Sequence, residues 1–499
     1  MKNNVNQDFK EILLRGVVVI TKTVIPLLLG TFFASCASLN DIKFNNTDLG
    51  SNLPFPVIPE SELWANSSQT ELPTIHWVDS FSDPVLRDLV QEAFVSNPSM
   101  LAAKYRVDAA NARIDISDSE RFPSLSANSR LSRNENASSL PGSTNISSGL
   151  TTSWEYDLWG RIENSIDASF LDFKAVSADY NSARLSVAGQ VSLAWFDLIE
   201  TRLLSELSNR TVATKTRALE LTQRRFEGGV TGSSDVRLAR SSLASAQASQ
   251  SLQLQRLSSA TRRVEILLRR YPAAELQAPS DLPELPKLKG VGTPGYVLRN
   301  RPDLLEAEYR LKSQGLQIEI AKKNLLPRIT LDGSGSLASR NLNDFFEIDA
   351  LVASLAGSIS APIFQGGRLK ANVSQQKSIM KSQIESYAGL ILNAYLEVEN
   401  AIGSEKRLSE QEKALRISLN EAQKAESRLE LRYTEGLATI LQLLDAQSRS
   451  LTAEGQLISS RKERLSNRVR LHVALGGGVE LLKLSHGTDA QAFKIEKKE

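Results

Sequence analysis

The sequence predicts a mixed α/β membrane protein with an internal two-fold repeat, four β-strands in one chain and long coiled-coil hairpins. Three observations predict this class: similar motifs recur 204 to 207 residues apart, the apolar period switches between seven and two, and the first 35 residues read as an export signal. Among the 499 residues, only 6% are aromatic, which favours long helices over one large globular core.

Composition excludes several functional classes. Residues 1–35 hold four of the 59 basic and two of the 57 acidic residues, so 55 of each remain and the rest of the chain is neutral. Neutrality argues against nucleic-acid binding. A single cysteine excludes a disulfide framework and a cysteine-based zinc site. Because no nucleotide loop, metal-binding helix motif or nucleophile elbow is found, we predict no enzyme and no cofactor or metal.

The N-terminus is predicted to be a signal peptide over residues 1–35. Basic residues precede an apolar run at 24–33, and small residues follow it. Phe33-Ala34-Ser35-Cys36 resembles a lipobox, which implies that Cys36 becomes the first residue and carries lipid such as palmitate. The alternative is a signal-anchor helix over 16–35, which is long enough to span a membrane but contains Lys22.

The repeat sets the domain organisation. Residues 97–106 align with 301–310, and residues 225–230, which contain Gly229 and Val230, align with 432–437, which contain Gly436 and Leu437. We predict an N-terminal arm over 36–79, a first repeat over 80–275, a Pro-rich linker over 276–295, a second repeat over 296–478 and a tail over 479–499.

Each repeat is predicted to begin with a helix and continue into a β-hairpin. Apolar residues recur every seven positions, at Met100, Val107 and Ile114 and again at Leu304, Leu311, Ile318 and Leu325. After Pro123 and Pro327 the period becomes two, which predicts β-hairpins over 123–158 and 327–363 with one apolar and one polar face.

Long helical hairpins are predicted to complete each repeat. No proline interrupts 142–271 or the residues after Pro362, and an apolar stripe follows the helical period. Glycines break the pattern near 228–233 and 435–439, so these segments are predicted to be the tips of antiparallel hairpins.

Four strands cannot close a barrel, and an open strand edge cannot face lipid. Two chains would supply eight strands around a filled interior, whereas three would supply twelve with room for a pore. The helical hairpins would then form a second barrel that extends into the periplasm. A lipid-anchored periplasmic coiled-coil adaptor or scaffold is the alternative, although it has no use for paired strands with one lipid-compatible face.

The chain resembles the TolC-like outer-membrane factors of tripartite efflux pumps, in particular their lipid-anchored branch. Five motifs in order carry the resemblance: Trp77 with Phe81-Ser82-Asp83-Pro84, Trp154-Glu155-Tyr156-Asp157-Leu158-Trp159-Gly160-Arg161, Arg301-Pro302-Asp303, Ala361-Pro362-Ile363-Phe364-Gln365-Gly366-Gly367 and Ala474-Leu475-Gly476-Gly477-Gly478. The resemblance implies a homotrimer with a twelve-stranded barrel in the outer membrane. It also implies a passive duct served by a periplasmic adaptor and an inner-membrane pump of the resistance–nodulation–division type.

The resemblance also implies site residues at the tips. Asp445 matches one of two acids that face the family's pore, and Gln442 replaces the other. Tyr433 and Asp235 match a hydrogen-bonded pair that holds the channel shut, whereas Ala438 replaces a second latch. Gly229, Val230, Gly436 and Leu437 match the adaptor-binding tip motif. A simple helix stop and a solvated aspartate remain the plainer interpretations.

Two further groups have plainer roles. Trp154 and Tyr156 are typical of an aromatic belt at a membrane interface, whereas Trp159 beside Gly160 is predicted to pack in the strand-to-helix joint. The three histidines, His76, His472 and His486, are isolated in sequence and are given no function.

Overall fold

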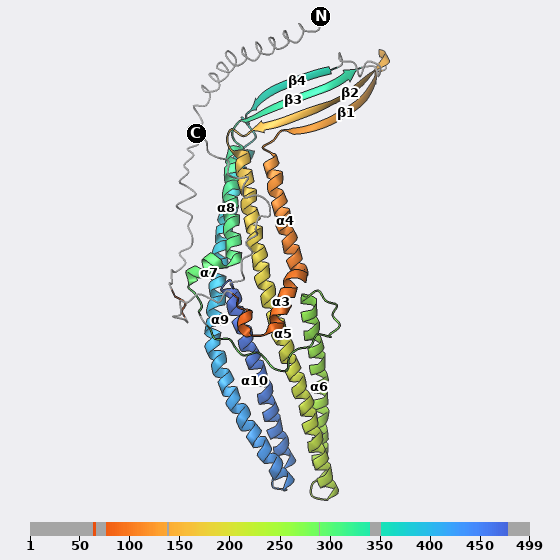
Figure 1. Ribbon diagram of the computed structural model, residues 1–499, viewed down its shortest axis with the longest axis vertical. Helices are drawn as coiled ribbons and strands as arrows, with labels where there is room; N and C mark the ends of the chain where they lie inside the picture. The colour runs from red at the N-terminus through yellow and green to blue at the C-terminus, as the bar shows by residue number, and fades with distance from the viewer. Residues whose placement is uncertain (1–62, 66–75, 137–138, 289, 340–350, 478–499) are drawn as a thin grey trace. The chain divides into compact units, whose positions relative to one another are not determined.

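The structure is a computed structural model that describes residues 63–65, 76–136, 139–288, 290–339 and 351–477. The predicted signal, Cys36, His486 and the tail at 479–499 lie outside the described residues. The described helices are α3 (Pro84–Ser96), α4 (Pro98–Ser119), α5 (Arg161–Glu227), α6 (Ser233–Leu267), α7 (Pro294–Asn300), α8 (Pro302–Lys323), α9 (Arg368–Thr434) and α10 (Ile440–Ala474). The strands are β1 (Ser124–Asn136), β2 (Ser139–Tyr156), β3 (Arg328–Ser339) and β4 (Leu351–Ser360), which confirms a mixed but mostly helical fold (Figure 1).

The four strands form one antiparallel sheet in the order β1-β2-β3-β4. The register places Ala127 opposite Leu150, Leu150 opposite Gly335, and Gly335 opposite Ala353. Residues of the predicted apolar alternation therefore share one face across all four strands. This face carries large side chains that are exposed in the single chain: Leu125, Leu131, Leu150, Tyr156, Leu331, Leu351, Leu355 and Ile359.

The two longest helices, α5 and α9, have 67 residues each, and α6 and α10 have 35 each. At about 1.5 Å per residue, a helix of that longer length extends about 100 Å. α9 and α10 begin and end 207 residues after α5 and α6, as the bounds show. Figure 1 shows α5 running from the sheet to the turn at its far end.

The short helices begin where the sequence supplies caps. Proline occupies the first turn of α3, α4, α7 and α8, where its missing N–H costs nothing. The Asp83 and Asn97 side chains accept hydrogen bonds from the first backbone N–H groups of α3 and α4. Asp83 also accepts a hydrogen bond from the indole of Trp195 at 2.8 Å, which fixes α3 against α5.

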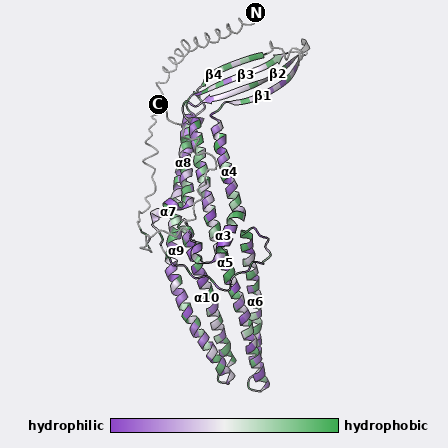
Figure 2. Ribbon diagram, viewed as in Figure 1, coloured by the Kyte–Doolittle hydropathy of each residue, from purple (hydrophilic) through white to green (hydrophobic). Residues whose placement is uncertain are grey.

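None of the described helices is long and apolar enough to cross a membrane. Figure 2 shows hydrophilic residues along the length of the long helices, in keeping with helices that pack through a narrow apolar stripe.

The main core lies where α3, α5, α6 and α10 meet. It contains fully buried aromatic side chains, among them Trp77, Trp195 and Phe196. A second core, which includes Leu304 and Val398, joins α8, α9 and α10. Trp64 of the arm is buried in this second core, and its indole donates a hydrogen bond to the Gly292 carbonyl at 3.1 Å.

The joint between sheet and helices is held by long-range hydrogen bonds. The Trp154 indole donates to the Arg121 carbonyl at 2.8 Å, and Lys323 Nζ donates to the Gly160 carbonyl at 2.9 Å. The prediction that Trp159 packs in this joint is wrong, because its side chain is 43% exposed. Its indole still donates to the Pro327 carbonyl at 2.7 Å, so the hydrogen bond rather than burial places it.

The glycines after α10 permit a close approach. Gly476 has φ +82°, and a Cβ at this position would lie 3.0 Å from the Arg301 Cα. Arg301 pairs with Asp303 at 2.9 Å and Glu397 at 2.7 Å, and it donates to the Ala474 carbonyl at 3.1 Å. The motif that begins at Arg301 and the motif that begins at Ala474 therefore contact each other.

The Pro-rich linker has no regular structure before α7 begins, yet it is tied to the helices. Leu282 is buried in the main core, and Asp281 pairs with Arg461 at 3.0 Å. The Pro286 carbonyl accepts a hydrogen bond from Arg468 of α10. The segment is a packed strap across the helices rather than a free spacer.

His472 is buried beside Trp77, with the two rings stacked at a centroid distance of 5.6 Å. Burial, and secondarily the charge of Arg468, lowers its pKa from 6.5 to about 4. Below pH 6.5 this histidine is therefore protonated in the unfolded chain, whereas in the folded chain it is protonated only near pH 4.

We expect this histidine to make the folded chain less stable in acid. Its contribution is complete above pH 6.5 and falls by about 3 kcal/mol towards pH 4. Thermal unfolding in detergent at pH 7.5 and pH 5 should show a larger loss for the unaltered protein than for His472→Phe, which keeps a stacked ring. An identical loss in both proteins would contradict this assignment.

Candidate functional site at the hairpin tips

Both tips end in the same turn. Gly229 has φ +71° and Gly436 has φ +81°, conformations that favour glycine. The Val230 N–H donates to the Arg225 carbonyl at 2.8 Å, and the Leu437 N–H donates to the Arg432 carbonyl at 2.8 Å. Val230 and Leu437 are 65% and 64% exposed. Each glycine thus ends a long helix and presents an apolar side chain to the outside.

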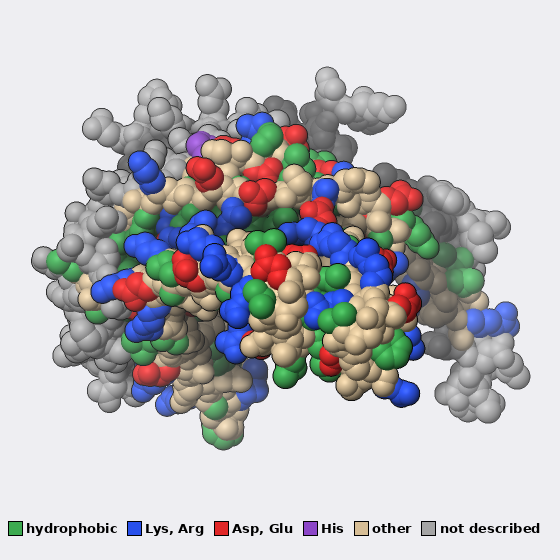
Figure 3. Space-filling view, turned by 90° about the horizontal axis from the view of Figure 1, so that it is seen from below, with side chains coloured by type: hydrophobic (Ala, Val, Ile, Leu, Met, Phe, Trp, Pro, Cys, Tyr) green, Lys and Arg blue, Asp and Glu red, His purple; other side chains and the backbone are tan. Residues whose placement is uncertain are grey.

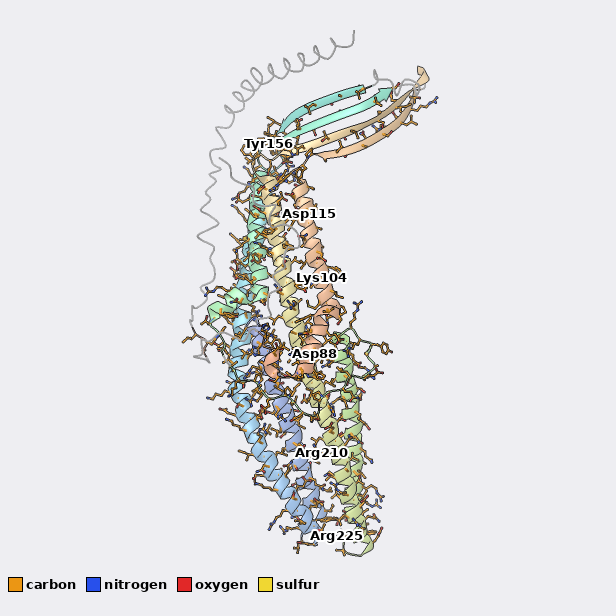
Figure 4. The ribbon with its side chains drawn as sticks, viewed as in Figure 1. Asp88, Lys104, Asp115, Tyr156, Arg210 and Arg225 are labelled. Atoms are coloured by element: carbon orange, nitrogen blue, oxygen red, sulfur yellow. The ribbon has the colours of Figure 1, made fainter. Side chains whose placement is uncertain are left out.

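Three residues join the two hairpins beside the tips, and we call Thr222, Arg225 and Tyr433 the tip cluster. Tyr433 at the end of α9 is only 2% exposed, and its hydroxyl lies 2.9 Å from the buried Thr222 hydroxyl of α5. The Arg225 guanidinium lies over the Tyr433 ring, with Cζ 4.7 Å from the ring centroid, and donates to the Tyr433 carbonyl. Figure 4 labels Arg225 at this end of the hairpins.

A small apolar core supports the tip cluster. Tyr433 packs with Ala218, Ile440, Leu443 and Leu444, and Ala438 packs against the same group. The position that the resemblance assigns to a second latch is therefore occupied by an apolar contact.

The predicted pair Asp235–Tyr433 is not made within the described part of the chain. Asp235 lies in the first turn of α6 and accepts a hydrogen bond from the Thr231 hydroxyl of its own hairpin. The Tyr433 hydroxyl faces Thr222 instead. The link between hairpins inside one chain therefore runs through α5 rather than α6, because α5 packs against α10 more extensively than α6 does.

Asp445 and Gln442 have local partners. The Asp445 carboxylate pairs with Arg449 of the same helix at 2.9 Å, and its side chain is 58% exposed. Gln442 completes a capping box, since its side chain accepts from the Thr439 N–H at 3.0 Å while Thr439 caps the Gln442 N–H. Gln442 thus stabilises the start of α10, a role that its sequence neighbours Thr439-Ile440-Leu441-Gln442 could have indicated.

Polar residues that the sequence analysis missed line the contact between α5 and α10. Lys215 is buried and donates to the Gln447 side-chain carbonyl at 3.1 Å. Arg210, farther from the tip, pairs with Glu454 at 2.5 Å, and Figure 4 shows it higher on the hairpin. Lys215, Thr222 and Arg225 follow one another at spacings of seven and three residues, so a search for polar side chains on the apolar stripe would have found them.

The tip end also exposes apolar surface. Leu431 and Leu441, like Leu437, are each 64% exposed. Figure 3, which views the molecule from below, shows hydrophobic side chains among prominent Lys and Arg side chains. Exposed apolar groups with a charged surround are typical of protein contacts. In the described residues no cluster of His, Cys, Asp and Glu could hold a metal ion.

Comparison with known proteins agrees with this architecture. The model of the family described as outer membrane efflux protein matches residues 89–268 and 293–477. The outer membrane protein OprJ of Pseudomonas aeruginosa is 28% identical over 437 residues, which cover 85% of this chain and 91% of OprJ.

Two solved channels extend the comparison. The open state of the Neisseria gonorrhoeae MtrE outer membrane channel is 29% identical, with a TM-score of 0.75 over 86% of this chain and 97% of MtrE. The Campylobacter jejuni CmeC outer membrane channel is 22% identical and matches in fold, with a TM-score of 0.79 over 86% of this chain and 94% of CmeC.

Fold and motifs together define an outer-membrane transport protein of the efflux class. Because the family model covers both halves, the chain belongs to the outer membrane efflux protein family. The resemblance to the outer-membrane factors of efflux pumps is confirmed, and the family consists of efflux channels rather than enzymes.

Proposed function

We propose that the chain is the outer-membrane channel of a tripartite efflux pump, a passive trimeric exit duct for small molecules. The observation that carries the proposal is the continuous apolar face of the sheet, whose large side chains Leu131, Leu355 and Ile359 are 72%, 76% and 68% exposed in one chain. Such a face suits lipid, and the opposite face, with Ser153 and Asp332 hydrogen-bonded at 2.6 Å, suits an aqueous interior.

The open sheet argues for closure by other chains. β1 and β4 are edge strands in the described sheet, and unpaired strand edges are not tolerated in lipid. Three chains would contribute twelve strands and leave room for a duct. The equal lengths of α5 and α9, and of α6 and α10, support the proposed repeat and a second, helical barrel built from six hairpins.

The tips are the proposed gate. Asp445 from three chains would form an anionic ring that favours cations, with Gln442 close by on the same helix. The tip cluster holds α9 against α5, which supports a closed arrangement in which Tyr433 is fixed and Asp235 is left to meet a neighbouring chain. Gly229, Val230, Gly436 and Leu437 form the proposed contact with a periplasmic adaptor, and their exposed apolar groups support it.

Anchoring and partners complete the proposal. Removal of residues 1–35 and lipidation of Cys36 would tether the arm to outer-membrane lipid, with the helical barrel in the periplasm. The adaptor and an inner-membrane pump would supply contact and energy, as the resemblance to the outer-membrane factors of tripartite pumps implies.

Lipid exposure of the two sheet faces tests the proposal against the adaptor alternative. Leu355→Cys and Ser354→Cys are neighbours on opposite faces of β4. Spin labels at these positions should differ in liposomes: the label at 355 should collide with lipid-soluble oxygen, and the label at 354 with a water-soluble relaxing agent. The mass in detergent should equal three chains. A monomer in which both labels meet only water would favour the adaptor or scaffold.

A further inference from the structure

Lys215 is a buried amino group at the contact between the two hairpins. It is 6% exposed on α5, and its Nζ donates to the Gln447 side-chain carbonyl at 3.1 Å and to the Leu444 carbonyl at 3.5 Å. Gln447 is itself only 2% exposed. Among the described residues no carboxylate forms an ion pair with Lys215, so both acceptors are neutral.

A charge in this position is poorly compensated. An ammonium group has three N–H donors, whereas the site offers two acceptors, one of them a helical carbonyl at the limit of hydrogen-bond distance. The free energy required to remove an ammonium ion from water is larger than the free energy gained from hydrogen bonds to neutral groups. Burial accordingly lowers the pKa of Lys215, although the charge of Glu426 opposes the shift.

The neighbours of Lys215 on the same helix are better satisfied. About two turns towards the tip, Thr222 is bonded to Tyr433, and in the other direction Arg210 pairs with Glu454. These contacts hold α5 against α9 and α10. Lys215 brings a buried charge into the same contact without a carboxylate in ion-pair distance among the described residues, so separation of the hairpins would hydrate it.

We propose that Lys215 is an opening element: its buried ammonium group weakens the contact between α5 and α10, so that the hairpins part at lower cost. The inference rests on the proposed gate at the tips. It assigns to one residue an effect on the equilibrium between the open and the closed gate. The tip cluster favours the closed arrangement, and Lys215 opposes it.

Single-channel recording in planar bilayers tests the direction of the effect. The double variant Lys215→Met, Gln447→Met removes the charge and its acceptor together, so no polar group is left unpaired. We expect its open probability to fall roughly tenfold or more. Gln447→Met alone leaves the ammonium group with one acceptor, and its open probability should rise.

The competing interpretation, that Lys215 holds the hairpins together, predicts the opposite change in open probability for the double variant. If Lys215 merely braces the hairpins, both the double variant and Gln447→Met will open more often, and the proposal is overturned. No change in the double variant overturns it as well. Lys424→Met is the charge control, because Lys424 is exposed on α9 and its pair with Glu421 is solvated.

Assembly and thermal stability are measured separately from conductance. Each variant should retain the assembly mass of the unaltered protein in detergent, and the double variant should also unfold at a higher temperature. If the unaltered protein, Lys424→Met and Gln447→Met all never conduct, the proposed channel function fails. If they conduct and the double variant does not close, only the role of Lys215 fails.

Discussion

Replacing Arg225 with alanine is expected to raise the open probability of the purified channel by about tenfold to a hundredfold. Arg225 is the one tip-cluster residue that makes two kinds of contact with Tyr433, a hydrogen bond to its carbonyl and a cation–π contact with its ring. A hydrogen bond from a charged group contributes about 1.5–3 kcal/mol and a cation–π contact about 1 kcal/mol. Loss of both contacts weakens the attachment of α9 to α5 near the tip, where the hydrogen bond between Thr222 and Tyr433 remains.

The Arg225 effect has matched controls. Arg224→Ala removes the same charge from an exposed neighbour and should leave conductance near that of the unaltered protein. Arg225→Lys keeps the charge but lacks the planar guanidinium, so it should fall between the two. Cells that carry Arg225→Ala should admit a large antibiotic normally excluded by the outer membrane. Equal open probability in Arg225→Ala and Arg224→Ala would remove the tip cluster from the gate.

Replacing Glu405 with glutamine is expected to destabilise the chain by about 3 kcal/mol, the largest effect of a substitution on folding that we predict. Glu405 of α9 pairs with Arg464 at 3.2 Å and with Arg468 at 3.1 Å, both on α10. Arg468 is only 3% exposed and lies beside the strap that crosses the helices. Without the carboxylate, a buried guanidinium keeps its charge but loses its counter-ion.

Glu463→Gln is the control for this effect. Its partner Arg470 lies 2.8 Å away, but the two side chains are 40% and 51% exposed, so the pair contributes little. Thermal unfolding in detergent should show a midpoint several degrees lower for Glu405→Gln and an almost unchanged midpoint for Glu463→Gln. Equal midpoints would show that the buried pair does not hold α9 to α10.

Sequence reasoning located the elements because their signals are local. The seven-residue repeat at Leu304, Leu311 and Ile318 predicted a packed helix, and all three side chains are buried. The two-residue period before Pro362 predicted the faces of the strands, since a strand alternates its side chains whatever its partners are. Turn glycines marked the tips, because Gly229 and Gly436 adopt positive φ.

The contacts at the tips were not predicted from the sequence, because they depend on which helices pack together. Tyr433 was singled out, but its partner is Thr222 on α5 rather than Asp235 on α6. Nothing local to Tyr433 specifies that choice, which depends on how α5 packs against α9 and α10. The burial of Lys215 was not predicted for a related reason. A lysine in a helix is expected to be exposed to solvent until the facing helix is known.

The most direct test of the central claim is single-channel conductance of the detergent-purified full chain in planar bilayers, with its mass measured in the same preparation. A gated outer-membrane duct predicts an assembly of three chains with discrete, mostly closed, cation-preferring currents that become frequent in Arg225→Ala. An assembly of three chains that stays silent in both the unaltered protein and Arg225→Ala would contradict the account.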